Sequence, residues 1–256
     1  MEKKVLAFDF GASGGRAMCG TFDGDKISIE ELHRFSNDPV ILNGSMYWDV
    51  LRLFFEIKQG LIKAKKCGKI ESIGIDTWGV DFGLIDEEGR LLENPVHYRD
   101  ARTEGMIEES FKLIDKEKFY QITGNQFMDL NTAFQLLSLV KTRKELLEKA
   151  DKMILMPDLF NYFLTGEKKA EYSIASTTQL LDAKKGEWSD EVIEGTWEFR
   201  NIFSRKSYLQ VQRSVLLQMK SVQSLVWIRL MLWLLRDMIR RVHLYLYQHR
   251  KKILSS

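Results

Sequence analysis

Hydrophobic and polar positions alternate along the first part of the chain. Residues 5–8 are apolar and lead into Asp9, and a second apolar run begins at Ala17. A glycine-rich turn joins the two runs, which predicts a β-hairpin. Residues 26–34 alternate between apolar and polar side chains, which predicts a further strand. The chain is therefore expected to begin with an antiparallel meander.

The apolar spacing changes to a helical period after this meander. Apolar side chains from Val50 to Leu61 recur at the spacing of an amphipathic helix. Two apolar segments at 70–76 and 80–86 then predict buried strands, which we expect to pair with each other. Later patterns predict helices at 104–118, 132–148 and 158–164 and a short strand at 153–156. Strands followed by mixed strands and helices are typical of an α/β domain.

The composition is that of a soluble globular protein. The chain has 256 residues, of which 45% are hydrophobic and 29% charged. Its two cysteines, Cys19 and Cys67, have neither the spacing of a disulfide framework nor that of a metal site. No long apolar stretch follows Lys3 and Lys4, so we expect no signal peptide and a cytoplasmic location.

The charge is distributed unevenly. The formal net charge is +2, but residues 202–256 contain eleven lysines and arginines and one acidic residue, Asp237. The last glycine is Gly195 and the last proline is Pro157. Such a change in composition indicates a boundary near residue 195.

The first polar group with candidate chemistry is the turn at residues 9–16. It contains three glycines, which predict positive φ angles and backbone amides open to a ligand. Successive amides can form a concave site for an anion, and Ser13 and Arg16 can add donors. Asp9 lies where a hydrated Mg²⁺ between phosphates needs a carboxylate. An ordinary glycine-rich hairpin with a capping aspartate gives the same pattern.

Two further polar groups follow. At residues 74–82, Trp78 can stack on a sugar and Gly79 permits close approach of its backbone to a hydroxyl group. The carboxylates of Asp76 and Asp81 can accept hydrogen bonds from sugar hydroxyl groups. A pair of strands with capping acids and a core tryptophan would give the same sequence pattern. Residues 97–103 combine aromatic, arginine and aspartate side chains, as in a polar cleft wall or a solvated, salt-bridged loop.

These groups together resemble the FGGY family of carbohydrate kinases. Residues 8–16 are similar to the first phosphate hairpin of the family, and the Ala-Ser form ending in Gly-Arg resembles its rhamnulokinase branch. Residues 74–82 are similar to the sugar-binding loop, and 97–103 resemble the aromatic-Arg-Asp-x-Arg segment. Further similar segments continue in order to about residue 194, at 124–127, 131–135, 156–158, 173–182 and Trp188.

The resemblance implies a fold, an activity and a set of site residues. The fold is an actin/hexokinase-like (ribonuclease H-like) ATPase domain with a mixed five-stranded sheet. The activity is ATP-dependent phosphorylation of L-rhamnulose, with ATP and Mg²⁺ as cofactors and no nucleic-acid or membrane partner. Alternatives are a kinase for another deoxyketose such as L-fuculose, and a non-catalytic sugar-binding remnant.

The resemblance also assigns residues to each ligand. ATP phosphates are assigned to Asp9, Gly11, Ala12, Ser13, Gly14, Gly15 and Arg16, with Asp9 holding the metal through water. The sugar is assigned to Asp76, Trp78, Gly79, Asp81, Tyr98, Asp100 and Arg102.

The resemblance ends near residue 194. The family continues with a Leu-Gly-Ile-Pro turn and later a Gly-His-Asp-Thr motif, whose aspartate is the general base. In a reading frame shifted by one base, each codon would combine the last base of one tail codon with the first two bases of the next. The codons of Trp197 and Glu198 can then give only glycine, and those of Met238 and Ile239 can give only aspartate. These forced residues are in register with the two motifs.

We therefore expect residues 1–194 to be the N-terminal domain and residues 195–256 to be a frameshifted, non-native basic tail that lacks the catalytic base. The alternative is a genuine basic helix at 225–235 that binds an anionic membrane surface or nucleic acid.

Overall fold

The structure is a computed structural model that describes residues 2–197, with side chains described through Ile193. Almost all of the expected tail at 195–256 lies outside this range. No helix within the described residues is long and apolar enough to cross a membrane.

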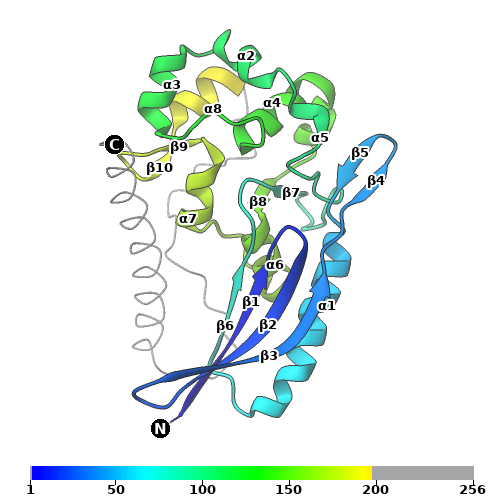
Figure 1. The fold of residues 1–256 in the computed structure, drawn as a ribbon. Helices are drawn as coiled ribbons and strands as arrows, with labels where there is room; N and C mark the ends of the chain where they lie inside the picture. Colours follow the sequence, from blue (N-terminus) through cyan, green and yellow to red (C-terminus); the bar gives the residue numbers. More distant parts are fainter. Residues whose placement is uncertain (1, 198–256) are drawn as a thin grey trace, which may run out of the picture. The chain divides into compact units, whose positions relative to one another are not determined.

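A four-stranded mixed sheet is built from the first part of the chain (Figure 1). Strands β1 (Lys3–Phe10), β2 (Gly14–Phe22) and β3 (Ile27–Ser36) form the predicted antiparallel meander. Strand β6 (Ser72–Asp76) pairs in parallel with β1 on the other side. The strand order is therefore β3-β2-β1-β6, with β1 between β2 and β6.

Helix α1 (Val50–Ala64) covers one face of this sheet and contacts β2 and β3. Asp49 caps its N-terminus by accepting a hydrogen bond from the Arg52 amide at 3.0 Å. Gly60 allows the close approach, because a Cβ atom there would lie 2.5 Å from the ring of Phe8. The predicted helix at this position is confirmed, and a short 3-10 helix, η1 (Lys65–Cys67), ends it.

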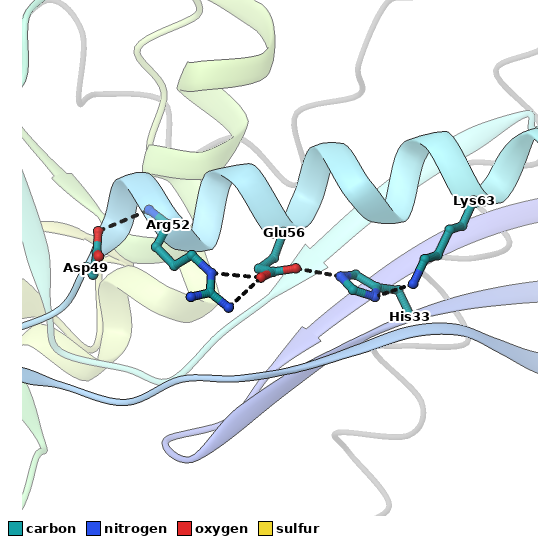
Figure 2. Close-up of polar contacts among 5 residues, drawn as sticks. All are labelled: His33, Asp49, Arg52, Glu56 and Lys63. Carbon is teal, nitrogen blue, oxygen red and sulfur yellow. Dashed lines mark hydrogen bonds and ion pairs between the residues drawn. The ribbon is translucent and has the colours of Figure 1, made fainter.

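An ionic network around one buried carboxylate also joins α1 to β3 (Figure 2). Glu56 is 5% exposed, and its carboxylate accepts a hydrogen bond from Arg52 Nε at 2.8 Å. The other carboxylate oxygen lies 2.6 Å from His33 Nε2, and Lys63 Nζ lies 2.8 Å from His33 Nδ1. Because Lys63 donates to Nδ1, the His33 proton resides on Nε2 and is donated to Glu56. The buried carboxylate thus has partners on both the helix and the strand.

The pairing of the next two strands differs from the expectation. Strand β7 (Phe82–Ile85) pairs antiparallel with β8 (Lys152–Leu155) and not with β6. The main sheet in residues 2–197 consequently has four strands and not the expected five. The reason lies in the connection: Val80 has a φ of +69°, and this tight turn directs β7 away from β6.

Both long helices expected in the second part are divided. The segment at 104–118 is interrupted because Asp115 caps a new helix, accepting from the Lys118 amide at 2.9 Å. The segment at 132–148 is interrupted at Arg143, whose φ of −148° is not helical. The helices are α2 (Met106–Phe111), α3 (Lys116–Thr123), α4 (Thr132–Thr142), α5 (Lys144–Glu148), α6 (Met156–Thr165), α7 (Tyr172–Ala175) and α8 (Asp190–Trp197). The smaller elements are β4 (Val40–Leu42), β5 (Ser45–Tyr47), η2 (Ala101–Thr103), η3 (Ser176–Thr178), β9 (Leu181–Asp182) and β10 (Glu187–Trp188).

Two apolar clusters form the interior. One joins the sheet to α1 and α6, and within it Phe10 stacks on Phe160 with ring centroids 5.0 Å apart. The other joins the β7–β8 pair to α3, α4 and α5 around Phe119 and Phe134. Trp78 packs against the first cluster, whereas Phe82 belongs to the second. The segment between these two residues therefore passes from one core to the other.

Candidate functional site

Two carboxylates lie side by side at the carboxyl ends of the central strands. Asp9 and Asp76 are register partners of the parallel strands β1 and β6. Arg16 Nη2 lies 2.6 Å from Asp9 Oδ2. Asp76 has an exposed edge, but surrounding protein shields its carboxyl from water and so raises its pKa, and the negative charges of Asp9 and Glu171 raise that pKa further. This end of the sheet therefore collects negative charge.

The donor set fits a magnesium ion held through water. Carboxylate oxygens are the ligands that Mg²⁺ prefers, and Mg²⁺ commonly keeps several waters and contacts one or two carboxylates. Within residues 2–197, no group of three or more histidine, cysteine, aspartate or glutamate side chains is arranged to hold a metal ion. Asp9 and Asp76 can thus supply a second coordination sphere, with one positive side chain, Arg16, beside them.

The turn between β1 and β2 uses its glycines for packing. Gly11, Gly14 and Gly15 do not have positive φ angles, so that expectation is wrong. A Cβ atom at Gly15 would lie 2.3 Å from the ring of Phe35, and one at Gly14 would lie 2.9 Å from the Phe35 carbonyl oxygen. Gly14 and Gly15 are required because β3 packs directly against them, whereas a Cβ atom at Gly11 would approach the Gly14 carbonyl oxygen at 3.4 Å and no atom of β3.

Asn37 holds the tip of this hairpin. Its side-chain amide donates to the Gly11 carbonyl at 2.9 Å, and its backbone amide donates to the Ser13 carbonyl at 3.2 Å. The two groups of a trans peptide point in opposite directions, so the Ala12 amide, which shares a peptide with the Gly11 carbonyl, points away from Asn37. Asn37 is 2% exposed and was not identified from the sequence, where its only signal is an amide side chain after a strand.

The segment between β6 and β7 contains a strained turn at Val80. The Asp81 amide donates to the Gly79 carbonyl at 2.9 Å, which closes a three-residue γ-turn around Val80, whose φ is +69°. A β-branched residue rarely adopts a positive φ, and such a conformation persists only where its surroundings impose it. Here the Val80 amide donates to Thr177 Oγ1 at 3.2 Å, and Thr132 Oγ1 donates to the Val80 carbonyl at 2.6 Å.

Asp81 is the buried centre of a hydrogen-bond network. It is 1% exposed, so its carboxylate lies beneath the surface. Burial raises the pKa of this carboxyl to about 6, although four donors oppose the shift. These donors are Trp48 Nε1 at 2.6 Å, Gln135 Nε2 at 2.9 Å, Trp78 Nε1 at 3.0 Å and the Tyr98 amide at 3.2 Å.

Four aromatic rings gather above this network. Trp48 is fully buried, with the Trp78 and His97 ring centroids each 4.0 Å from its own. Tyr98 packs against the same group and, like Trp78, is half-buried. Burial, with a contribution from the charge of Arg99, lowers the pKa of His97 to about 4, so its ring is neutral at pH 7. Trp48 and His97 were not assigned a role from the sequence.

Asp100 and Arg102 are connected to the same group of residues by hydrogen bonds. Asp100 accepts hydrogen bonds from the Met46 amide at 2.7 Å and from the Arg102 amide at 3.0 Å, and so fixes the loop to β5. Arg102 Nη2 donates to Gln135 Oε1 at 2.7 Å, while its buried Nε has no partner within the described residues. Burial lowers the pKa of Arg102. Gln135 therefore connects the guanidinium to Asp81.

Comparison with known proteins identifies the family. Residues 4–205 match the model of the FGGY family of carbohydrate kinases, N-terminal domain. The chain belongs to this family. It is 43% identical over 204 residues to a rhamnulokinase of Oceanobacillus iheyensis, covering 79% of this chain and 43% of that protein. It is 46% identical over 191 residues to a rhamnulokinase of Halalkalibacterium halodurans, covering 74% of this chain and 40% of that protein. The FGGY chain thus spans about two-fifths of the length of these relatives.

Solved structures place the FGGY domain among sugar kinases by fold. A gluconate kinase from Lactobacillus acidophilus has a TM-score of 0.68 at 17% identity, covering 76% of this chain and 39% of that one. A Plasmodium falciparum glycerol kinase with ADP has a TM-score of 0.65 at 19% identity, covering 78% of this chain and 41% of that one. The predicted α/β, actin/hexokinase-like fold is confirmed.

The FGGY domain arranges the candidate residues in two places. Asp9, Arg16 and Asp76 meet at the ends of the parallel strands. The residues from 78–81 and 97–102, separated in the sequence, meet around the Asp81 network. The half-buried side chains there are Trp78, Tyr98 and Arg102, whereas Asp81 and Asp100 lie below with their oxygens bonded to protein donors.

Proposed function

We propose that this domain is the phosphate- and sugar-binding half of a cytoplasmic kinase that transfers the terminal phosphoryl group of ATP to L-rhamnulose. The observation that supports this most strongly is the identity of 41–46% to five rhamnulokinases over about three quarters of the chain. The arrangement of the two candidate places is compatible with it, since one has the donors for a metal-phosphate group and the other has aromatic rings and a cation.

The phosphate side of the proposal rests on the β1–β2 hairpin and the strand ends. Asp9 would hold Mg²⁺ through water, with Asp76 beside it, and the turn at Gly11–Arg16 would contact the phosphates. When bound, the ion supplies positive charge that stabilises the transferring phosphoryl group. Arg16, which pairs with Asp9 at 2.6 Å, is near enough to exchange that partner for a phosphate oxygen.

The sugar side rests on the half-buried residues above the Asp81 network. We assign stacking on the sugar to Trp78, backbone contact to Gly79, and hydrogen bonds to Tyr98 and Arg102. In this assignment Asp81 and Asp100 position those groups. Asp81 accepts from the Trp78 indole at 3.0 Å, and Asp100 accepts from the Arg102 amide at 3.0 Å.

We also propose that residues 195–256 come from a shifted reading frame. The family base would then be encoded in the other frame, where the codons of Met238 and Ile239 force aspartate. General-base assistance is worth about 10²–10⁴-fold in rate. The 256-residue chain is therefore expected to bind the sugar but not to transfer phosphate to it at a useful rate.

Paired measurements test both proposals. Titration calorimetry with the 256-residue chain should detect L-rhamnulose binding, weakened by Arg102→Gln and unchanged by Lys112→Gln on the surface of the helical part. A gene with one base added near codon 195 should give a protein that phosphorylates L-rhamnulose in a coupled ATP assay, and Asp9→Ala should reduce its turnover. An early stop codon in that frame would refute the shifted-frame proposal. Preference of the restored protein for L-fuculose, or sugar binding without turnover, would refute the proposed reaction.

A further inference from the structure

The fold brings together the two cysteines of the chain. Cys19 lies in β2 and Cys67 ends η1, far away in the sequence. Both side chains belong to the apolar cluster between the sheet and α1, and they form a hydrogen bond with each other. This contact joins the second strand of the candidate phosphate hairpin to the short helix that ends α1.

The two thiols have different surroundings. Cys19 is 3% exposed and Cys67 is 9% exposed. Burial and the hydrogen bond with Cys67 together raise the pKa of the Cys19 thiol to about 11, against the charge of Lys4, which lowers it. Cys67 follows Lys65 and Lys66 in the sequence. The thiol of Cys67 is therefore the better placed of the two to meet a reagent first.

A metal site does not explain the pair. Structural zinc sites use four ligands and catalytic sites at least three protein ligands. Within residues 2–197, no group of three or more histidine, cysteine, aspartate or glutamate side chains could hold a metal ion. The cluster that contains both thiols is apolar and also includes Leu6, Leu32 and Ala64.

We propose that Cys19 and Cys67 form a reversible intramolecular disulfide when the protein meets a small disulfide such as oxidised glutathione. The Cys67 thiolate attacks one sulfur of the reagent, forming a mixed disulfide and releasing one reduced thiol. Cys19 then loses its proton to solvent and attacks Cys67 Sγ, which releases the second reduced thiol. The protein loses two hydrogens and two electrons, and one molecule of the reagent is reduced to two thiols.

The end of α1 provides access for this exchange. Cys67 lies in a three-residue 3-10 helix, which is followed by Gly68 with a φ of +81°. The Gly68 amide donates to the Lys65 carbonyl at 3.3 Å, a long hydrogen bond that closes this turn. Ends of helices open locally at low cost, so Cys67 can become exposed without unfolding of the sheet.

The disulfide should have a measurable effect on stability. It would close a loop of about 50 residues, for which loop-closure entropy raises the folding equilibrium constant on the order of a thousandfold. The effect should appear as an unfolding midpoint at higher urea concentration in the oxidised chain. In a reducing compartment both residues would remain thiols, so the bond would form only under oxidising conditions.

Intact mass spectrometry of the full chain after incubation with oxidised glutathione tests the proposal. The expected product is a monomer lighter by two hydrogens, without bound glutathione, and reversible by dithiothreitol. Cys19→Ser should retain one glutathione at Cys67, whereas Cys67→Ser should remain unmodified.

Three results would overturn the proposal. They are persistent glutathione on the unsubstituted chain, a disulfide-linked dimer, and two free thiols per chain under conditions that modify Cys19→Ser. Urea unfolding adds an independent measurement, since an oxidised chain with an unchanged midpoint would also contradict it.

Discussion

Replacement of Asp81 by asparagine isolates the energetic effect of the buried carboxylate. The asparagine would keep one acceptor oxygen but turn an amide group toward one of the four donors. Gln135 cannot rotate to accommodate it, because its Oε1 accepts from Arg102 at 2.7 Å and its Nε2 donates to the Leu130 carbonyl at 2.8 Å. The lost hydrogen bond should destabilise the chain by about 1–3 kcal/mol at low pH, where Asp81 is protonated.

The difference between the two proteins should then change with pH. Burial raises the pKa of Asp81 from 3.8 to about 6 in the folded chain, so the folded state holds the proton more tightly than the unfolded state. Stability from this group is present below the unfolded pKa and is lost as pH rises through the folded pKa. The full change is about 3 kcal/mol, of which about 2 kcal/mol falls between pH 4.5 and 7.5.

Urea unfolding followed by tryptophan fluorescence measures this difference. The destabilisation caused by Asp81→Asn should shrink by about 2 kcal/mol as pH rises from 4.5 to 7.5, and the variant should approach or exceed the wild type at neutral pH. Contributions of the other titrating groups cancel when the two proteins are compared at each pH. A difference that stays constant across this range would refute the conclusion that ionising Asp81 costs stability.

Three further substitutions test other parts of the structure. Gly15→Ala places a Cβ 2.3 Å from the Phe35 ring and should destabilise the chain by about 1–3 kcal/mol in urea unfolding, with partial recovery when Phe35→Leu is added. Glu56→Gln, which replaces the buried carboxylate by a less well paired amide, should cost about 1–3 kcal/mol. The exposed Glu31→Gln should have a far smaller effect, and equal effects would contradict the role of burial. Burial raises the pKa of Asp158 to about 7, so the unsubstituted chain should lose stability as pH rises from 5 to 8. The Asp158→Asn variant should lack this loss when thermal unfolding is measured across the same range.

Much of the fold follows from local pattern. The meander and α1 were predictable because β1–β3 alternate along one face and α1 has one apolar side with Asp49 as its cap. The partner of β7 was not, because the turn at Val80 depends on hydrogen bonds from residues that follow it by dozens of positions. A positive φ at a valine cannot be detected from the spacing of apolar residues in the sequence.

The candidate site was only partly predictable for a related reason. Asp9 and Asp76 end apolar runs, so their place at strand ends could be inferred, but their register required the sheet itself. Asn37, Trp48 and His97 act through contacts with distant segments, and no spacing in the sequence identifies them. The use of Gly15 for packing also depends on Phe35, which lies on the next strand.

The pairing of β1 with β6 sets the separation of the two carboxylates by backbone geometry. Neighbouring strands lie about 4.8 Å apart whatever side chains they carry. Substitutions in the apolar core can therefore weaken the sheet without rescaling the gap between Asp9 and Asp76. In the proposed metal site, lengthening a side chain at either position would change the size of the cation that fits between them. A shift of one strand by a single residue would instead place the two carboxylates on opposite faces of the sheet.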